Sequence, residues 1–196
     1  MRCMENIALP TPVEWVAELM RNRVQPGAWV VDATAGNGND TLLLAQAVGA
    51  RGRVFAFDVQ AAALTATRAL LKESGAPGVC TLIHAGHECL ADHLPTEARG
   101  QLAAVMFNLG WLPGHDKACI TRAQTTLPAL QTALEWLMPG GLITVVVYPN
   151  HGPDEAQAVA EWVCSLSART FEARNLRSHY RWGRSPEAWA IRKRVR

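Results

Sequence analysis

The chain has 196 residues, 49% of them hydrophobic and 18% charged, and its formal net charge is +2. This composition excludes a disordered chain, and the length favours one domain with a sizeable core. No apolar run approaches the length of a membrane span, and the first residues lack the apolar centre of a signal peptide, so we expect no membrane partner. The five cysteines show no CxxC spacing, which is typical of free thiols in a reducing cytoplasm.

Thr11, Pro12 and Glu14 form the pattern of a capped helix start. After this helix, apolar runs alternate with helical patterns. The expected strands are residues 28–35, 54–59, 80–84, 103–108 and 142–148, and the expected helices are residues 39–48, 61–73, 88–94 and 126–137. Pro128 then falls in the first turn of its helix, where proline is tolerated. Because the strands are apolar throughout rather than alternating, they indicate a parallel sheet in a doubly wound α/β domain.

The C-terminal part has a different pattern. A helix near residues 154–166 is followed by strands at 171–176 and 187–194, which we expect to form a closing antiparallel pair joined through a basic turn. Residues 169–196 carry nine Lys or Arg and two acids, a net charge of +7, whereas the preceding residues carry −5. A protein that handles a polyanion shows such a distribution, and so does one with a solvated basic face.

Residues 30–41, VVDATAGNGNDT, end a strand, pass through two glycines and open a helix. Asp32 and Asp58 close successive strands at the edge where open α/β sheets bind ligands, so we expect both to contact the ligand. A carboxylate at the second position is placed to accept hydrogen bonds from ribose hydroxyls. Asp40 stands at the helix start, where it would repel a pyrophosphate. Gly36 and Gly38 admit a close ligand, and S-adenosylmethionine, a phosphate-free adenosine cation, fits this pattern. The alternative is a tight turn with a helix-capping Asn39 or Asp40.

Asn108, Gly110 and Trp111 follow the fourth strand and have the spacing of the acceptor motif of amino-group methyltransferases. The Asn108 side-chain oxygen can accept a hydrogen bond from an amine and aim its lone pair at a methyl group, so that positioning carries much of the rate. Trp111 offers a face for stacking a base. The alternative is a turn at the end of a strand with a buried tryptophan.

Histidines and cysteines crowd residues 84–93, but their spacing matches no usual zinc pattern, and we expect no metal site. Gly86 and His87 instead predict the wall of an adenine pocket at the end of the third strand, with His84 and His93 as ordinary structural histidines.

Several loop residues could reach the same cleft. They are His115, Lys117, Tyr148 and His151. Arg181 and Arg184 flank Trp182 and offer phosphate contacts and a stacking surface, as proteins use for single-stranded RNA loops. In each case the alternative is a solvated loop or a basic hairpin tip.

Together these motifs resemble the class I methyltransferases once labelled putative rRNA methylases, a family now associated with methylating 5-aminomethyl-(2-thio)uridine at the tRNA wobble position. The resemblance rests on DATAGNGNDT, DVQ, GHE, FNLGWLPGHDK and LMPGGLITVVVYPNH. It implies a Rossmann-like, seven-stranded fold. By similarity, the residues that contact S-adenosylmethionine are Asn37, Asn39, Asp58, Gln60, Gly86 and His87. Asn108 and its neighbours, including Leu112 and Pro113, would face the acceptor amine. This sequence has Trp111 where the family usually has tyrosine, and Asn150 where the family usually has glycine.

The resemblance predicts a single domain over residues 1–196: a helical lead-in (1–27), a cofactor-binding core (28–151) and a C-terminal helix with a basic hairpin (152–196). The expected function is N-methylation of an aminomethyl group on a wobble uridine, with the tRNA anticodon stem-loop as partner. An rRNA base or a small amine as acceptor, and a non-catalytic RNA-binding protein, stay open as alternatives. The sequence also leaves open whether the chain is a homodimer.

Overall fold

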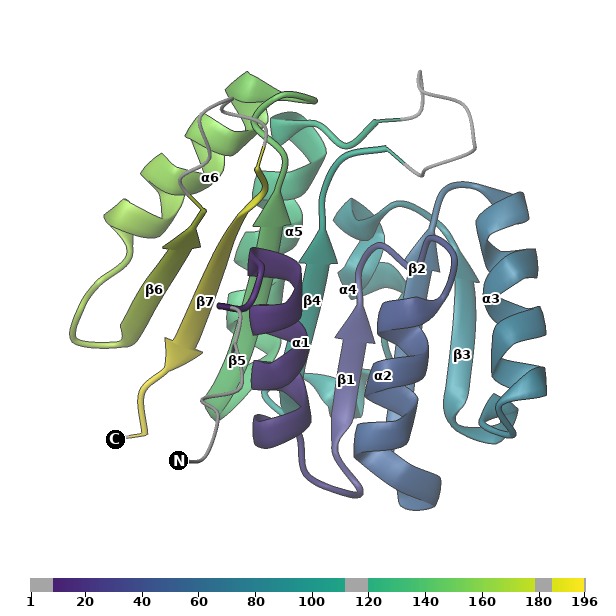
Figure 1. Ribbon diagram of the computed structural model, residues 1–196. Helices are drawn as coiled ribbons and strands as arrows, with labels where there is room; N and C mark the ends of the chain where they lie inside the picture. Colours follow the sequence, from purple (N-terminus) through teal and green to yellow (C-terminus); the bar gives the residue numbers. More distant parts are fainter. Residues whose placement is uncertain (1–8, 112–119, 179–184, 196) are drawn as a thin grey trace, which may run out of the picture.

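The computed structural model describes residues 9–111, 120–178 and 185–195 (Figure 1). Within these residues the strands form one seven-stranded sheet in the order β3-β2-β1-β4-β5-β7-β6. The strands are β1 Trp29–Asp32, β2 Arg53–Asp58, β3 Cys80–His84, β4 Leu102–Asn108, β5 Leu137–Val147, β6 Phe171–Arg177 and β7 Glu187–Lys193. The first five run parallel, and β7 is antiparallel to both β5 and β6. The predicted α/β class and the closing antiparallel pair are confirmed.

Helices cover both faces of the sheet (Figure 1). The helices are α1 Pro12–Arg23, α2 Asn39–Val48, α3 Ala61–Glu73, α4 Leu90–His93, α5 Ala123–Trp136 and α6 Pro153–Ser165. The first three pack on one face, and the last three pack on the other. In β4 the buried side chains alternate between these layers: Val105 and Phe107 join the α5–α6 side, and Ala104 and Met106 join the α1–α2 side. A sheet that is covered by helices on both faces requires strands that are apolar throughout.

Local signals in the sequence explain where some helices begin and end. The capping box at α1 is formed, because Glu14 N donates to Thr11 Oγ1 at 3.2 Å and Thr11 N donates to the Glu14 carboxylate at 2.8 Å. At the other end of the chain, Lys193 Nζ donates to the carbonyls of Leu134 and Leu137, at 3.2 and 2.7 Å. A lysine there stabilises the carbonyl end of α5.

The structure corrects several boundaries. The first strand ends at Asp32, and α5 begins at Ala123, so Pro128 lies in the interior of the helix and not in its first turn. The fifth strand begins at Leu137, five residues earlier than predicted. The predicted helix at 88–94 is a 3₁₀ turn, His87–Cys89, followed by the short α4. None of the helices in the described part of the chain has the length and apolarity needed to cross a lipid bilayer.

Candidate active site

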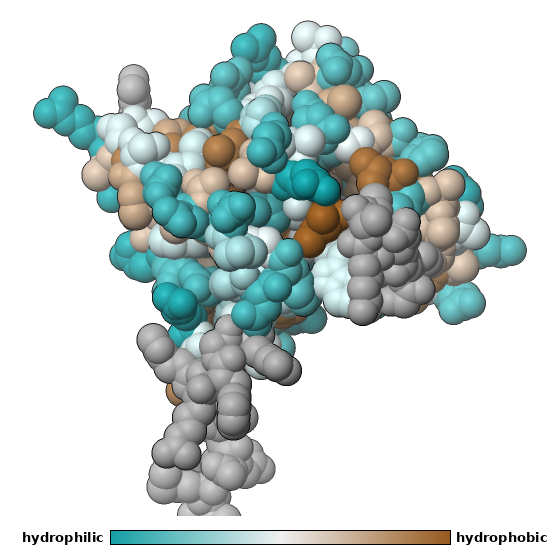
Figure 2. Space-filling view, turned by 90° about the horizontal axis from the view of Figure 1, so that it is seen from above, coloured by the Kyte–Doolittle hydropathy of each residue, from teal (hydrophilic) through white to brown (hydrophobic). Residues whose placement is uncertain are grey.

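A cavity of about 530 Å³ opens where the parallel strands end. Its described lining comes from the loop after β1, the ends of β2, β3 and β4, and the residues just after β5. Figure 2 views the molecule from this edge and shows hydrophilic residues around a smaller apolar patch near the centre of the face. This is the edge at which open α/β sheets bind ligands, and the volume is ordinary for a small-molecule site.

A larger cavity, of about 980 Å³, lies at the opposite edge, beside α1 and the starts of β1, β4 and β5. Its described lining includes Trp15, Trp29, Met138 and Arg174, and none of the residues that the sequence analysis assigned to a ligand. We therefore take the smaller cavity as the candidate active site.

Asp58 at the end of β2 is hydrogen-bonded to the glycine loop. Its two carboxylate oxygens accept hydrogen bonds from Gly36 N at 2.9 Å and Gln60 N at 2.8 Å. The Gly36 carbonyl in turn accepts from Thr67 Oγ1 of α3 at 3.1 Å. Asn37 and Asn39 are exposed and line the cavity with Asp58 and Gln60. The structure thus brings together the polar groups predicted to meet the ribose and the loop predicted to lie beside it.

Gly38 does not line the described cavity wall, although the sequence analysis placed it against the cofactor. It is the residue before α2, with φ +87°. A Cβ on Gly38 would lie 2.8 Å from the Thr67 Cα, closer than real contacts allow. The glycine is required for the contact of the loop with α3 and for the left-handed backbone.

Asp32 is absent from the described cavity lining and is buried at the end of β1, so its contact with the cofactor stays a prediction. The side chain is 1% exposed, accepts from Thr41 Oγ1 at 2.5 Å and accepts from Thr34 N at 3.1 Å. Burial, with the nearby charges of Asp40 and Asp58, raises the pKa of Asp32 to about 7, although its two hydrogen bonds act in the opposite direction.

His87 and Gly86 lie at the end of β3 and line the cavity on the side of the predicted adenine pocket. His87 is buried, and burial lowers the pKa of its imidazole, which favours the neutral form. Its ring packs edge-on against Phe107, and its Nε2 lies 3.4 Å from Thr126 Oγ1. A neutral, fixed imidazole is a suitable wall for an uncharged base.

Asn108 closes β4 and is held from two sides. Its backbone N donates to Thr34 Oγ1 at 2.8 Å, and its Nδ2 lies 3.4 Å from Asp40 Oδ2 on α2. Since the amide nitrogen faces Asp40, the Asn108 Oδ1 is the atom left to accept a hydrogen bond. Burial raises the pKa of Asp40, and the bond from Asn108 lowers it. The sequence analysis used Asp40 to exclude a phosphate and as a candidate helix cap, and its contact with Asn108 was not foreseen.

Three rings surround the residues after Asn108. Trp111 Nε1 donates to His151 Nδ1 at 2.7 Å, and the His151 ring stacks on Tyr148 with centroids 5.2 Å apart. Gly110 has φ +131°, a backbone conformation that favours glycine, and a Cβ there would lie at an ordinary contact distance of 3.5 Å from Tyr148 and His151. Trp111, Tyr148 and His151 therefore line one side of the cavity, as the sequence analysis expected of Tyr148 and His151.

A buried carboxylate on α6 joins the two sides of the site, and no sequence signal pointed to it. Glu155, 6% exposed, accepts from Thr121 Oγ1 at 2.7 Å and from Thr126 Oγ1 at 2.6 Å. Thr121 Oγ1 also accepts from Gly110 N at 2.8 Å, while Thr126 lies beside His87. Glu155 thus connects the predicted acceptor loop to the predicted adenine wall.

Some predicted substrate residues lie outside the described part of the chain. They are Leu112, Pro113, His115, Lys117, Arg181 and Arg184. The described residues that flank the first segment, Trp111 and Ile120, form an antiparallel bridge at the cavity. Of the described residues near the second segment, Arg177 and Glu187 pair with each other at the edge where β5 ends, since Glu187 also pairs with Val147.

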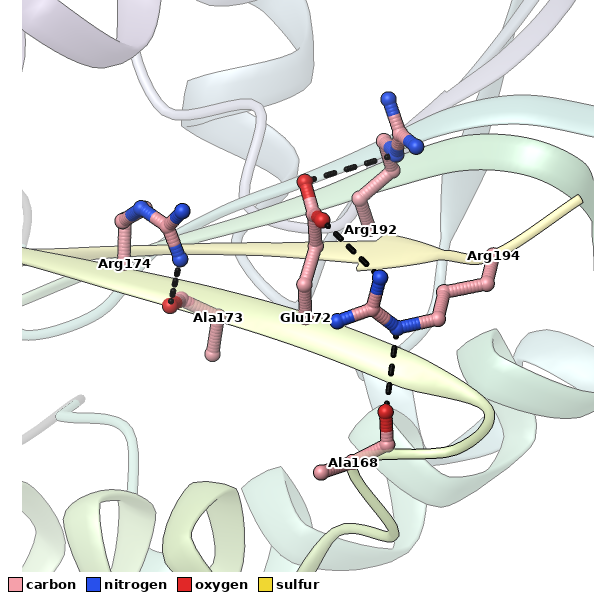
Figure 3. Close-up of polar contacts among 6 residues, drawn as sticks. All are labelled: Ala168, Glu172, Ala173, Arg174, Arg192 and Arg194. Carbon is pink, nitrogen blue, oxygen red and sulfur yellow. Dashed lines mark hydrogen bonds and ion pairs between the residues drawn. The ribbon is translucent and has the colours of Figure 1, made fainter.

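Several arginines of the basic C-terminal region have partners within the fold: Arg177 pairs with Glu187 at 3.0 Å, and Arg174 donates to the Ala173 carbonyl at 3.1 Å. Figure 3 shows Glu172 between Arg192 and Arg194, each at 3.5 Å, and Arg194 Nε donating to the Ala168 carbonyl at 3.0 Å. Arg192 pairs in register with Leu142, so this cluster lies at the edge opposite the candidate site. None of the three charged residues of this cluster is in the described lining of the candidate site.

The histidine-rich segment has protein partners. His84 Nε2 lies 2.9 Å from the Val59 carbonyl, and the His93 ring packs edge-on against Phe57. Within the residues that the structure describes, no three His, Cys, Asp or Glu side chains gather as metal ligands would.

The charged side chains that line the cavity fit a cationic adenosine compound. The charged side chains of the described lining are three acids, Asp40, Asp58 and Glu88, and one base, Arg122. An acidic cavity disfavours phosphates and favours a sulfonium or an ammonium group. Asp58 retains lone pairs for ribose hydroxyls beside its two backbone donors.

This strand order, with a glycine loop after β1, an acid ending β2 and Asn-Leu-Gly-aromatic after β4, defines a class I methyltransferase fold. Residues 54–192 match the family described as "Putative rRNA methylase". The chain belongs to this family, as the sequence analysis expected.

Solved structures share the whole fold. A putative rRNA methylase from Clostridium thermocellum is 35% identical, with a TM-score of 0.90 over 95% of this chain and 100% of that one. A putative methyltransferase from Streptococcus mutans, solved in complex with SAH, is 30% identical, with a TM-score of 0.85 over 95% of this chain and 99% of that one. The predicted seven-stranded methyltransferase fold is confirmed, and the predicted cofactor agrees with that complex.

A chloroplastic tRNA (mnm(5)s(2)U34)-methyltransferase from Arabidopsis thaliana is 39% identical over 160 residues, which is 72% of this chain. The match spans 58% of that relative, so the chain covers little more than half of its length.

Proposed function

We propose that this protein transfers the methyl group of S-adenosylmethionine to the nitrogen of an aminomethyl group on a tRNA wobble uridine. One observation carries the proposal: Asn108, fixed by Thr34 and Asp40, faces the same cavity as Asp58 and the glycine loop. A methyl donor and an amine acceptor need such neighbouring sites in one cleft.

The cofactor side is assigned to the first three strand ends. Asp58 and Gln60 would receive the ribose, and Gly86 and His87 would face the adenine. Asn37 and Asn39, in the glycine loop and at the start of α2, would also contact the cofactor. When bound, S-adenosylmethionine supplies a methyl group on a cationic sulfur. The acids of the cavity lower the cost of burying that cation.

On the acceptor side, Asn108 Oδ1 accepts an N–H of the amine and directs its lone pair into the cavity. Trp111 and Tyr148 offer ring faces near the base that carries the amine. Because the Trp111 indole is held by His151, its ring plane is fixed before substrate arrives. Fixed groups of this kind accelerate transfer by positioning rather than by strong acid–base chemistry.

The RNA substrate is supported by the relatives. The Arabidopsis relative is named for a tRNA wobble uridine, and the family for rRNA. Arg122 lines the cavity at the edge where phosphates of a bound stem-loop would pass. A tRNA substrate and the free thiols of Cys80, Cys89 and Cys164 fit the cytoplasm as location.

Nucleoside mass spectrometry of tRNA tests the proposal. A strain that lacks the gene should accumulate the unmethylated aminomethyl nucleoside, and the wild-type gene should restore the methylated form. The Asn108→Ala gene should not restore it. An unchanged tRNA profile, with a methyl group missing from rRNA or from a small amine instead, would overturn the assignment of the acceptor.

A further inference from the structure

Asp40 is one of the cavity acids beside the cofactor site, and it also faces the acceptor side. It lies in the first turn of α2 and lines the cavity, and its carboxylate faces Asn108 on the acceptor side. The residue before α2 is Gly38, so Asp40 is not the helix cap. Among the described residues, Asn108 is the donor whose hydrogen bond Asp40 accepts, through Oδ2. Oδ1 is left for a ligand.

We propose that Asp40 receives the proton of the acceptor ammonium before methyl transfer, an inference that rests on the proposed function. An alkylammonium has no lone pair, and its pKa near 10 keeps it protonated at neutral pH. Asn108 orients the nitrogen but cannot take its proton, because its amide is not basic. The Asp40 carboxylate contacts Asn108 and lines the same cavity, so it would lie beside an amine that Asn108 Oδ1 holds.

The proton balance of the step is simple. One N–H bond of the ammonium breaks, its electron pair stays on nitrogen as the lone pair, and an O–H bond forms at Asp40 Oδ1. The neutral amine then has the lone pair that methyl transfer requires. Asp40 is partly exposed at the cavity, so it can return the proton to water.

Other groups of the described lining fit this role less well. Asp58 already accepts two backbone hydrogen bonds at the ribose position, and Asp32 lies below the cavity. Tyr148 is a phenol whose pKa is raised by burial and by the charge of Asp40, so it holds its own proton. His151 Nδ1 accepts from Trp111.

The electrostatic surroundings make Asp40 a better proton acceptor than a solvated carboxylate. Burial raises its pKa, and the bond from Asn108 acts in the opposite direction. The titratable groups around it are Asp32 on β1, Tyr148 after β5 and, stacked on that ring, His151. From α1, the residue that lines the cavity is the apolar Val13.

The test is the pH dependence of kcat/KM for methylation of tRNA that carries the aminomethyl uridine, at saturating S-adenosylmethionine. Near neutral pH, Asp40→Asn should lower the rate about 10²- to 10⁴-fold. The deficit should shrink as the pH approaches the pKa of the amine itself, about 10. Asp92→Asn, which removes an exposed acid on α4 outside the cavity, should follow the wild type.

A deficit that is constant over the whole pH range overturns the inference, because it indicates a structural or purely electrostatic role. Asp40→Ser also removes the carboxylate and replaces Asp40→Asn if that variant does not fold. If the wild-type protein methylates this tRNA and both Asp40 variants show the same pH profile of kcat/KM as the wild type, the inference is overturned. The proposed function then still stands. Wild-type protein that does not methylate this tRNA overturns both.

Discussion

Gly38 and Thr67 are in such close contact that a Cβ on the glycine would lie 2.8 Å from the threonine Cα. This contact joins the glycine loop to α3, and the Thr67 hydroxyl strengthens it by donating to the Gly36 carbonyl. The position of the loop beside Asp58 therefore depends on the absence of a side chain at residue 38.

Gly38→Ala should destabilise the protein and weaken cofactor binding. Gly27→Ala is the matched control, because Gly27 has φ +88°, against +87° for Gly38, and no atom within 4 Å of the added Cβ. Both variants lose about 1 kcal/mol or more from the left-handed backbone. Gly38→Ala should lose about 1–3 kcal/mol beyond this from overpacking, as measured by denaturant unfolding. Equal losses for the two variants would contradict the packing role of Gly38.

Asp58→Asn should weaken S-adenosylmethionine binding. The substitution keeps one oxygen acceptor but removes the charge, which strengthens hydrogen bonds to ribose hydroxyls. A loss of about 1.5–3 kcal/mol corresponds to an affinity about 10- to 100-fold lower by calorimetry. Asp92→Asn serves as the control with an exposed acid. Unchanged affinity in Asp58→Asn would remove Asp58 from the cofactor site.

Thr121→Val should disturb the acceptor side more than the cofactor side. It leaves the Gly110 N–H and one Glu155 oxygen without their partner, at a cost of about 1–3 kcal/mol of stability. We expect kcat to fall while cofactor affinity changes little. In the control Thr65→Val, the lost hydroxyl donates only to the Ala61 carbonyl on an exposed helix face. A fall in cofactor affinity that matches the fall in kcat would contradict the assignment of Thr121 to the acceptor side.

The buried Asp32 makes stability depend on pH. Its pKa of about 7 in the folded protein exceeds the ordinary value of 3.8, so the folded state binds the proton more tightly. The free energy of unfolding should therefore fall as pH rises from 3.8 to about 7, by at most about 1.4 kcal/mol per pH unit from this group. Asp32→Asn should remove that part of the slope in thermal unfolding. An identical slope in both proteins would show that Asp32 is not protonated.

The sequence predicted most of the fold because its signals are local. Apolar runs marked the strands, and the Thr11 and Glu14 box marked the first helix. The start of β5 was missed because Leu137–Gly141 contains Pro and two Gly, which disfavour strand in isolation, and pairing with β4 overrides that preference.

The lining of the cavity was predictable where a motif marks the end of a strand, as at Asp58 and Asn108. The site was not predictable where chain-distant side chains meet. Glu155 is separated from Thr121 by 34 residues, and its burial follows only from the packing of α6 on α5. For the same reason the contacts of Gly38 with α3 and of Asp32 with α2 were not foreseen.

The most direct test of the account is methyl transfer by the purified protein, with S-adenosylmethionine labelled in its methyl group and tRNA that carries the aminomethyl wobble uridine. Wild-type protein should place the label on the amine nitrogen. Asn108→Ala should bind the cofactor normally and transfer about 10²-fold more slowly. Label that goes to another acceptor, or normal transfer by Asn108→Ala, would contradict the claim that the end of β4 presents an amine to the methyl donor.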